Sequence, residues 1–145
     1  MLKKKLPALL LSFTCLLLVA CSTADASYSA SSGFTKSSTL SVLDSTPTGK
    51  AIEAELFASG FNIIAGSHSG PAAQAEPQYL AKLIVRRTWR GVVAGVVPGL
   101  ITLTISDSKT GNVVATANYD LGSFSYNSTH DAARAIVHAL SREIR

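Results

Sequence analysis

Few residues in this sequence have the types and spacing that catalysis or metal binding requires. The three histidines lie at intervals that are not typical of metal ligands: His68, His130 and His138. Residues 46–50 read Thr-Pro-Thr-Gly-Lys, but this segment lacks the first glycine of a phosphate-binding loop and has Ala51 in place of the magnesium-binding hydroxyl. We therefore predict that the protein is not an enzyme and holds no metal or dissociable cofactor.

The amino-terminal segment has the features of an export signal. Lys3, Lys4 and Lys5 form a positive start, and residues 6–20 follow without a charge. This run of 15 residues is shorter than the about 20 that span a bilayer as a helix. It has the length of a signal-peptide core, so we expect residues 1–20 to be removed.

A cysteine lies directly after the predicted cleavage point. Leu18-Val19-Ala20-Cys21 places small residues before the cut and a cysteine at the first mature position. On these residues the chain resembles bacterial lipoprotein precursors. The resemblance implies that Cys21 carries a thioether-linked diacylglycerol and an N-acyl lipid, which together anchor the protein to a membrane. Ser22 after the cysteine implies the outer membrane with the domain facing the periplasm, although the inner membrane and the cell surface stay open.

The charge and cysteine content restrict the partners. The chain has 13 Lys and Arg against 9 Asp and Glu, and removal of three lysines with the signal leaves 10 against 9. A nearly neutral mature chain gives no reason to expect a nucleic-acid partner. Cys15 leaves with the signal and Cys21 is acylated, so we expect no disulfide.

The chain is long enough for one domain after the signal. Residues 21–38 are rich in Ser and Ala and have no apolar period, which predicts a flexible tether. Residues 39–145 then give elements in the order β-α-β-β-β-β-α. We predict an α/β domain of the α+β type, with a mainly antiparallel sheet of about four to five strands and two helices packed on one face.

Local signals define the helix ends within this domain. Thr46 and Pro47 predict the start of the first helix, and Gly60 follows its end. Ser128 and Asp131 have the spacing of a capping box before the last helix. The core-facing stripe of that helix consists of Ala133, Ile136, Val137, Leu140 and Ile144.

The order of these elements resembles a periplasmic domain found in several envelope families. The resemblance is carried by a strand at 40–44, a helix ending at 60–64 (Gly-Phe-Asn-Ile-Ile), a hairpin at 103–114 and the closing helix. The families are the amino-terminal domain of the Tol–Pal translocation protein B, the curli-secretion lipoprotein and the penicillin-binding-protein activator lipoproteins. The resemblance implies a binding or assembly role in the envelope and transfers no specific residue.

A basic stripe on the predicted strand 79–89 is the first candidate site. Alternation places Lys82, Arg86 and Arg90 on one face of the strand and Arg87 on the other. Thr102 and Thr104 are expected beside the stripe on the next strand. Such a stripe can bind lipid phosphate or an acidic protein surface, but it is also typical of a solvated sheet face.

The second candidate is the apolar segment 91–99, which contains no polar side chain. If the segment is a loop, Trp89, Val93 and Val96 form an exposed apolar patch of the kind that marks partner contacts. Alternatively, the strand continues to Val97 and turns at residues 98–99, which buries the valines.

We predict a membrane-anchored lipoprotein whose periplasmic domain tethers or assists an envelope protein assembly. Its contact surface combines the 89–99 segment with the basic strand face, and its oligomeric state is not indicated by the sequence. One alternative is a lipid or glycolipid binder with an apolar cleft between helices and sheet. Another is a subunit of an oligomeric secretion pore.

Overall fold

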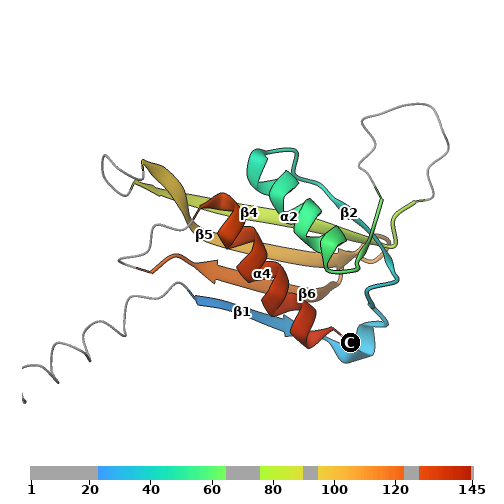
Figure 1. Cartoon of the computed structure of the whole chain (residues 1–145). Helices are drawn as coiled ribbons and strands as arrows, with labels where there is room; N and C mark the ends of the chain where they lie inside the picture. Colours follow the sequence, from blue (N-terminus) through green and yellow to red (C-terminus); the bar gives the residue numbers. More distant parts are fainter. Residues whose placement is uncertain (1–22, 65–75, 90–94, 123–127, 145) are drawn as a thin grey trace, which may run out of the picture.

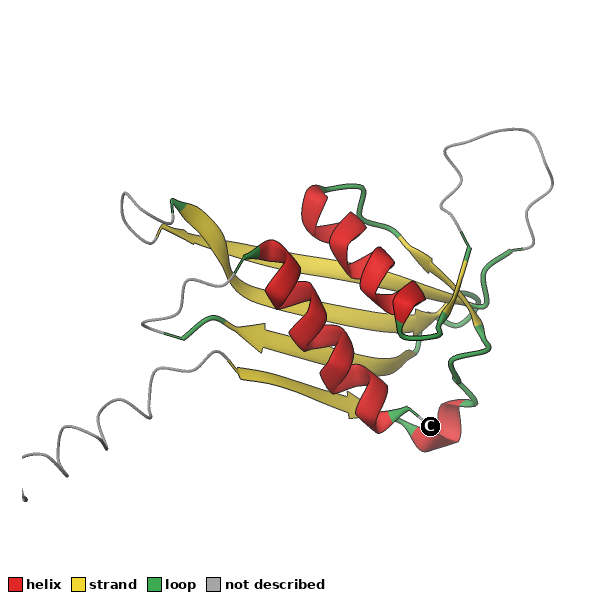
Figure 2. Cartoon of the chain, in the orientation of Figure 1, coloured by secondary structure: helices red, strands yellow, loops and turns green. Residues whose placement is uncertain are grey.

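The computed structural model describes residues 23–64, 76–89, 95–122 and 128–144. It contains a six-stranded sheet with two helices on one of its faces (Figures 1 and 2). The elements are β1 (Thr23–Tyr28), η2 (Ala30–Ser32), β2 (Thr39–Val42), α2 (Pro47–Ala58), β3 (Asn62–Ile63), β4 (Tyr79–Trp89), β5 (Val96–Asp107), β6 (Val113–Asp120) and α4 (Thr129–Glu143). The predicted α+β class is confirmed, with more strands than the four to five expected.

The strands lie in the order β1-β6-β5-β4-β2-β3. The pairs β1–β6, β6–β5 and β5–β4 are antiparallel, whereas β2 is parallel to both β3 and β4. Pairing of β4 with β2 stops early, because β2 reaches only Ala81 while β4 continues to Trp89. The two helices lie side by side across the same face of the sheet (Figure 1).

The flexible tether predicted for residues 21–38 is wrong over 23–38, the part that the structure describes. Residues 23–28 form the edge strand β1, in register with β6 from Thr23 opposite Asp120 to Tyr28 opposite Ala115. Phe34 is fully buried, and its ring lies 4.7 Å from that of Tyr79, centroid to centroid. The Tyr28 hydroxyl donates a hydrogen bond of 2.6 Å to the Phe34 carbonyl. Small alternating residues form this strand, so its apolar period is weak in the sequence.

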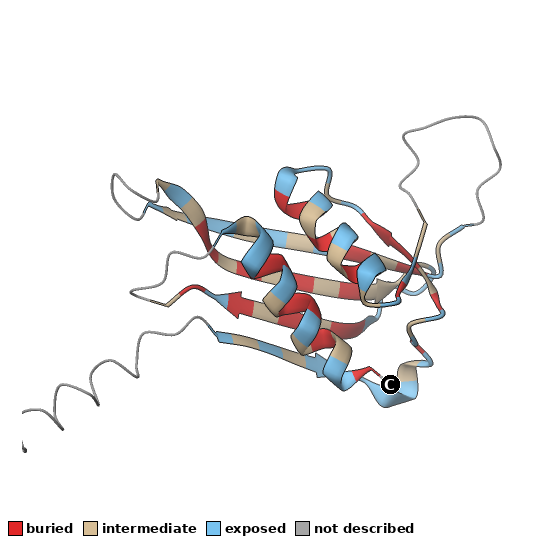
Figure 3. Cartoon of the chain, viewed as in Figure 1, coloured by how far each residue is buried: buried red, intermediate tan, exposed pale blue. Residues whose placement is uncertain are grey.

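The core lies between the sheet and the two helices. The predicted stripe of α4 is confirmed, since Ala133, Ile136, Val137, Leu140 and Ile144 are all buried. The sheet contributes alternate residues of its central strands, which face the helices. These are Ala81 of β4, Ile101, Leu103 and Ile105 of β5, and Ala115, Ala117 and Tyr119 of β6. Figure 3 shows this burial along the inner sides of both helices.

The helix ends follow the local signals. The Thr46 hydroxyl accepts a hydrogen bond of 3.2 Å from the Gly49 N–H at the start of α2. The capping box of α4 is complete, because Ser128 and Asp131 each accept the other's backbone N–H. Gly60, after α2, has a φ of 87°, a left-handed conformation that favours glycine.

Within the described segments, none of the helices has both the length and the apolar character needed to cross a membrane.

Candidate interaction surface

The face of the sheet opposite the helices is not covered by any element of the described chain (Figure 1). Lys82 and Arg86 lie on this open face and are exposed, as the alternation predicts. Thr104 lies directly opposite Lys82 on β5, and Thr102 lies two residues further along. The predicted basic stripe and its flanking threonines are thus brought together, but Arg90 lies outside the described residues.

An apolar residue that the sequence reasoning missed lies within this stripe. Ile84 is between Lys82 and Arg86 on the same face, and 57% of it is exposed. Leu43 lies beside them, because its N–H donates a 2.9 Å hydrogen bond to the Ala81 carbonyl at the end of β2. Leu43 is 59% exposed. The signal in the sequence is an isoleucine at a position where strand alternation calls for a polar side chain.

The part of the open face formed by β6 and β1 carries negative charge. Arg86 pairs with Leu100, Leu100 with Asp120, and Asp120 with Thr23 of the edge strand β1. Asp25 lies on the same face of β1, and both aspartates are exposed. In the described chain, ion pairs involve only Glu55, so the open face is basic along β4 and acidic along β6 and β1 without internal neutralisation.

The β4–β5 hairpin extends beyond the rest of the sheet. The last residue of β6 pairs with Leu100, and the Leu121 N–H donates to the Gly99 carbonyl at 2.8 Å. Residues 96–98 therefore pair with β4 alone, and Trp89 lies opposite Val96. Both side chains are exposed, at 65% and 57%.

The structure tests the loop and strand interpretations of segment 91–99 over residues 95–99, which it describes. A turn at residues 98–99 is wrong, because Pro98 and Gly99 lie inside β5 next to an irregularity in its pairing with β4. Such irregularities are among the few places where a strand tolerates proline. Val96 is exposed, as the patch interpretation requires, and Val97 is half-buried. Val93 lies outside the described residues.

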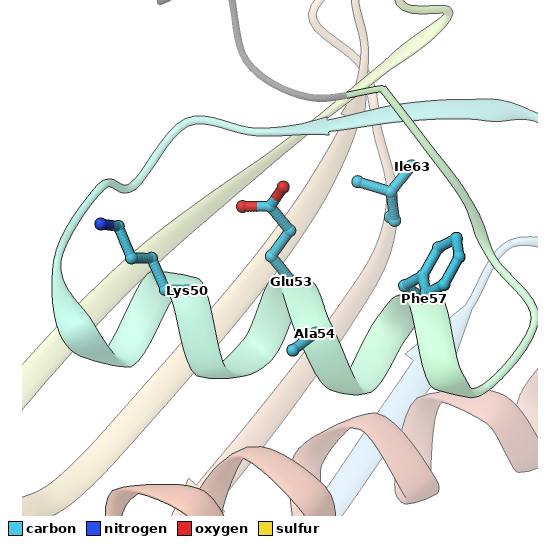
Figure 4. Close-up of a pocket in the computed structure, with 5 residues that line it drawn as sticks. All are labelled: Lys50, Glu53, Ala54, Phe57 and Ile63. Carbon is cyan, nitrogen blue, oxygen red and sulfur yellow. The ribbon is translucent and has the colours of Figure 1, made fainter.

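A shallow pocket of about 300 Å³ lies on the outer side of α2, next to β3. Phe57, Ala54 and Ile63 form its apolar part, and Lys50 and Glu53 lie at its other end (Figure 4). It opens to solvent, and Phe57 is 71% exposed. This pocket is not the cleft between helices and sheet that the lipid-binding alternative requires, because that space is filled by the core in the described chain.

Several titratable groups outside the open face make contacts within the fold. Glu55 of α2 accepts from His130 at 3.2 Å and approaches Arg134 at 3.8 Å, which links the two helices. Hydrogen bonds from the Ser128 hydroxyl and N–H lower the pKa of Asp131, and bonds from the Thr110 N–H and hydroxyl lower that of Asp107. No group of three or more metal-ligating side chains occurs in these segments. His68 and the predicted lipid attachment residue, Cys21, lie outside them.

Comparison with known proteins identifies a shared fold. No protein-family model matches the sequence, and no curated protein matches it. A PelC dodecamer from Paraburkholderia phytofirmans is 18% identical, with a TM-score of 0.57 over 86% of this chain and 99% of that chain. A variant PelC dodecamer is 16% identical, with a TM-score of 0.57 over 86% and 98%. At these identities the likeness establishes the fold alone, an α+β domain built on a mixed sheet.

A minor lipoprotein from Acinetobacter baumannii also matches, at 16% identity over 77% of this chain and 91% of that chain. Its TM-score of 0.33 is too low to establish a common fold.

Proposed function

We propose that this chain is a lipid-anchored envelope protein whose domain binds another envelope protein and performs no catalysis. Residues 1–20 direct export, and the lipid on Cys21 holds the domain on the periplasmic side of the outer membrane. The proposal is supported by the cysteine motif at 18–21 and by an uncovered sheet face that carries both charge and apolar groups.

The observation that carries the binding role is Ile84 between Lys82 and Arg86. A single exposed apolar residue is ordinary on a protein surface, but Ile84 has a second exposed apolar residue, Leu43, beside it at the end of β2. Neighbouring exposed apolar side chains are typical of a contact surface. An isoleucine flanked by two cations is suited to a protein partner with an apolar group beside carboxylates. Leu43 extends the apolar part of this surface at its edge.

Thr23, which follows the proposed lipid anchor by two residues, lies at the same end of the sheet as the protruding hairpin. Thr23, the first residue of β1, is in one cross-strand row with Asp120, Leu100 and Arg86, and the hairpin extends beyond that row. The two residue steps from Cys21 to Thr23 span at most about 7 Å. A lipid on Cys21 would therefore hold Trp89 and Val96 close to the bilayer, where tryptophan is favoured at the interface.

The sequence suggested one contact surface that combines the 89–99 segment with the basic strand face. We assign these two parts to different partners. The hairpin end, with Arg87 beside Trp89, is suited to lipid headgroups. The open face, with Ile84 on β4, stays available to a protein. The lipid-binding alternative then takes the form of a membrane contact, since the space between helices and sheet is filled by the core in the described chain.

A second candidate function is self-assembly into an oligomer. It corresponds to the secretion-pore alternative that the sequence left open. It is favoured by the shared fold with PelC, which was crystallised as a dodecamer. It is also favoured by the outer strand β1, which pairs only with β6 in the described chain. In this case the partner of the open face and its edges is another copy of the chain.

Membrane fractionation with the full-length protein tests the anchor. We expect the wild type in the outer-membrane fraction with a mature mass that includes acyl chains on Cys21. The Cys21→Ala variant should be soluble in the periplasm. An unmodified Cys21 in the mature wild type would refute the anchor.

Co-purification from cross-linked cells tests the binding role. The Ile84→Asp variant should lose the proteins that co-purify with the wild type. Phe57→Asp provides the matched control, because Phe57 is also an exposed apolar residue but lies on α2. Equal co-purification with all three proteins would refute the choice of surface.

A further inference from the structure

The open face of the sheet is ordered in rows that cross the strands. The pairings from β4 through β5 and β6 to β1 put one residue of each strand in every row. Counted from the hairpin end, the rows are Arg86, Leu100, Asp120 and Thr23; Ile84, Thr102, Asn118 and Asp25; and Lys82, Thr104, Thr116 and Ser27. None of these side chains is buried, so this surface is accessible in the described chain.

The charges on these rows are self-complementary. Arg86 and Lys82 make the β4 side positive, and Asp120 and Asp25 make the β6 and β1 side negative. None of the four side chains forms an ion pair within the described chain. A half-turn about an axis parallel to the strands exchanges the two sides and leaves every row at its own level. A second copy turned in this way therefore presents carboxylates to the cations and cations to the carboxylates.

We infer that two copies form a dimer through their open faces, with a two-fold axis that runs parallel to the strands above β5. The axis sets β4 of each copy against β6 of the other and β2 against β1, since the strand order is β1-β6-β5-β4-β2-β3. Arg86 then faces Asp120 of the second copy. Asp25 of the second copy lies one strand to the side, between the levels of Arg86 and Lys82, where both cations can reach it. Because the interface is two-fold, each contact occurs twice.

Apolar residues at the other end of the open face agree with this placement. Leu43 at the end of β2 is 59% exposed, and Val113 of β6 is 57% exposed. A shallow hollow of about 270 Å³ lies beside Val113, and its lining includes Ser27 and Thr116 of the open face. The axis sets Leu43 of one copy over Ser27 of the other, so that its side chain enters this hollow. Leu80, in the row of Val113, faces Val113 of the second copy.

The arrangement suits both the sheets and the anchor. Two twisted sheets pack face to face about 10 Å apart with their strands aligned to within about 30°, and a two-fold axis along the strands gives this alignment. The helices, which lie on the other face of each sheet (Figure 2), cover the outer sides of the dimer. The Thr23 ends of both copies lie at one level beside both hairpins, so two lipids on Cys21 would enter one bilayer.

The inference rests on the self-assembly candidate and names its interface. The residues that form the interface belong to the folded domain, so the dimer does not require the lipid.

Charge exchange tests the pairing of Arg86 with Asp120. In light scattering, the detergent-extracted full-length wild type should have the protein mass of a dimer. Arg86→Asp and Asp120→Arg should each have that of a monomer, because either change sets like charges against each other twice in the interface. An equimolar mixture of the two variants should recover the dimer mass, since both contacts in a mixed dimer again join opposite charges.

Lys50→Asp is the matched control, because it makes the same change of charge at an exposed position of α2, on the other side of the sheet. It should remain a dimer. A monomeric wild type would overturn the inference, and so would an Arg86→Asp variant that stays dimeric, a mixture that stays monomeric or a Lys50→Asp variant that dissociates. A monomeric wild type would leave the co-purification test of the proposed function unaffected, because that test detects other envelope proteins.

Chemical cross-linking tests the position of the axis. Thr102 lies on β5 below the axis, so the residues at position 102 of the two copies face each other with Cα atoms about 10 Å apart. A short bis-maleimide should link Thr102→Cys into dimers in the Cys15→Ala/Cys21→Ala background, which has no other cysteine. Ala58→Cys, exposed on α2, is the control and should not be linked. Equal linkage of the two variants, or none of Thr102→Cys, would overturn the inference.

Discussion

Arg86 and Asp120 both pair with Leu100, one from each side of β5, so that a cation and an anion lie in one row of the open face and are separated by two strand spacings. Neither is used in an ion pair within the described chain. The face is therefore polarised from β4 to β6. This polarity can orient a partner but contributes little to the stability of the subunit.

The first prediction concerns the β4–β5 hairpin. Trp89→Ala should change the free energy of unfolding by less than about 0.5 kcal/mol, because the side chain is 65% exposed. The same variant in the Cys21→Ala background should bind anionic lipid vesicles less than its parent in flotation. Val96→Asp should behave similarly. Unchanged flotation by both variants would argue against a membrane contact at this end of the sheet.

The second prediction concerns the segment that the sequence analysis took for a tether. Phe34→Ala should destabilise the domain by about 3–5 kcal/mol, because the ring is fully buried against Phe61 and Tyr79. Urea unfolding measures the change. If residues 23–38 were a flexible tether, Phe34→Ala would not change the free energy of unfolding. A variant as stable as the wild type would therefore support the tether. Ser31→Ala, on exposed η2, is the control within the same segment.

The third prediction concerns Gly49 in the first turn of α2. Helix propensity alone predicts that Gly49→Ala stabilises by about 1 kcal/mol. In this structure the added methyl group would overlap the backbone carbonyl of Asp44. We therefore expect the variant to lose about 1–3 kcal/mol, as overpacked sites do. A gain in the midpoint of thermal unfolding would contradict the close approach of the β2–α2 loop.

The fourth prediction concerns pH. Because hydrogen bonds from Ser128 lower the pKa of Asp131 in the folded protein, the capping box stabilises the fold above the unfolded pKa of about 3.9. This contribution is lost as the pH falls through the lower, folded pKa. Asp131→Asn and Ser128→Ala should both weaken the decline in stability between neutral pH and about pH 2. A decline identical to that of the wild type would show that the box does not contribute to acid unfolding.

Much of the fold could be predicted from the sequence because its signals are local. The α4 stripe, the caps at Thr46 and Ser128, and the alternation of Ile101, Leu103 and Ile105 are each contained within one element. In contrast, β1 has small alternating side chains, and its stability comes from pairing with β6, about 90 residues later in the chain. Such long-range pairing leaves no local period.

The candidate site could be predicted only in part, for a related reason. Strand alternation correctly placed Lys82 and Arg86 together on the exposed face of β4. Ile84 was missed because an isoleucine in a strand is normally assigned to the core, and its exposure depends on which face the helices cover. The distance by which the β4–β5 hairpin extends beyond the sheet could not be predicted from the sequence either, because it depends on where β6 ends relative to β5.

Photo-crosslinking in living cells from position 84 of the full-length protein tests whether the open sheet face is the binding surface, with position 138 on the exposed side of α4 as the control. We expect discrete protein adducts from position 84, either with an envelope protein or with a second copy, and none from position 138. Protein adducts from position 138 alone, or from neither position, would contradict the claim that the open sheet face is the binding surface.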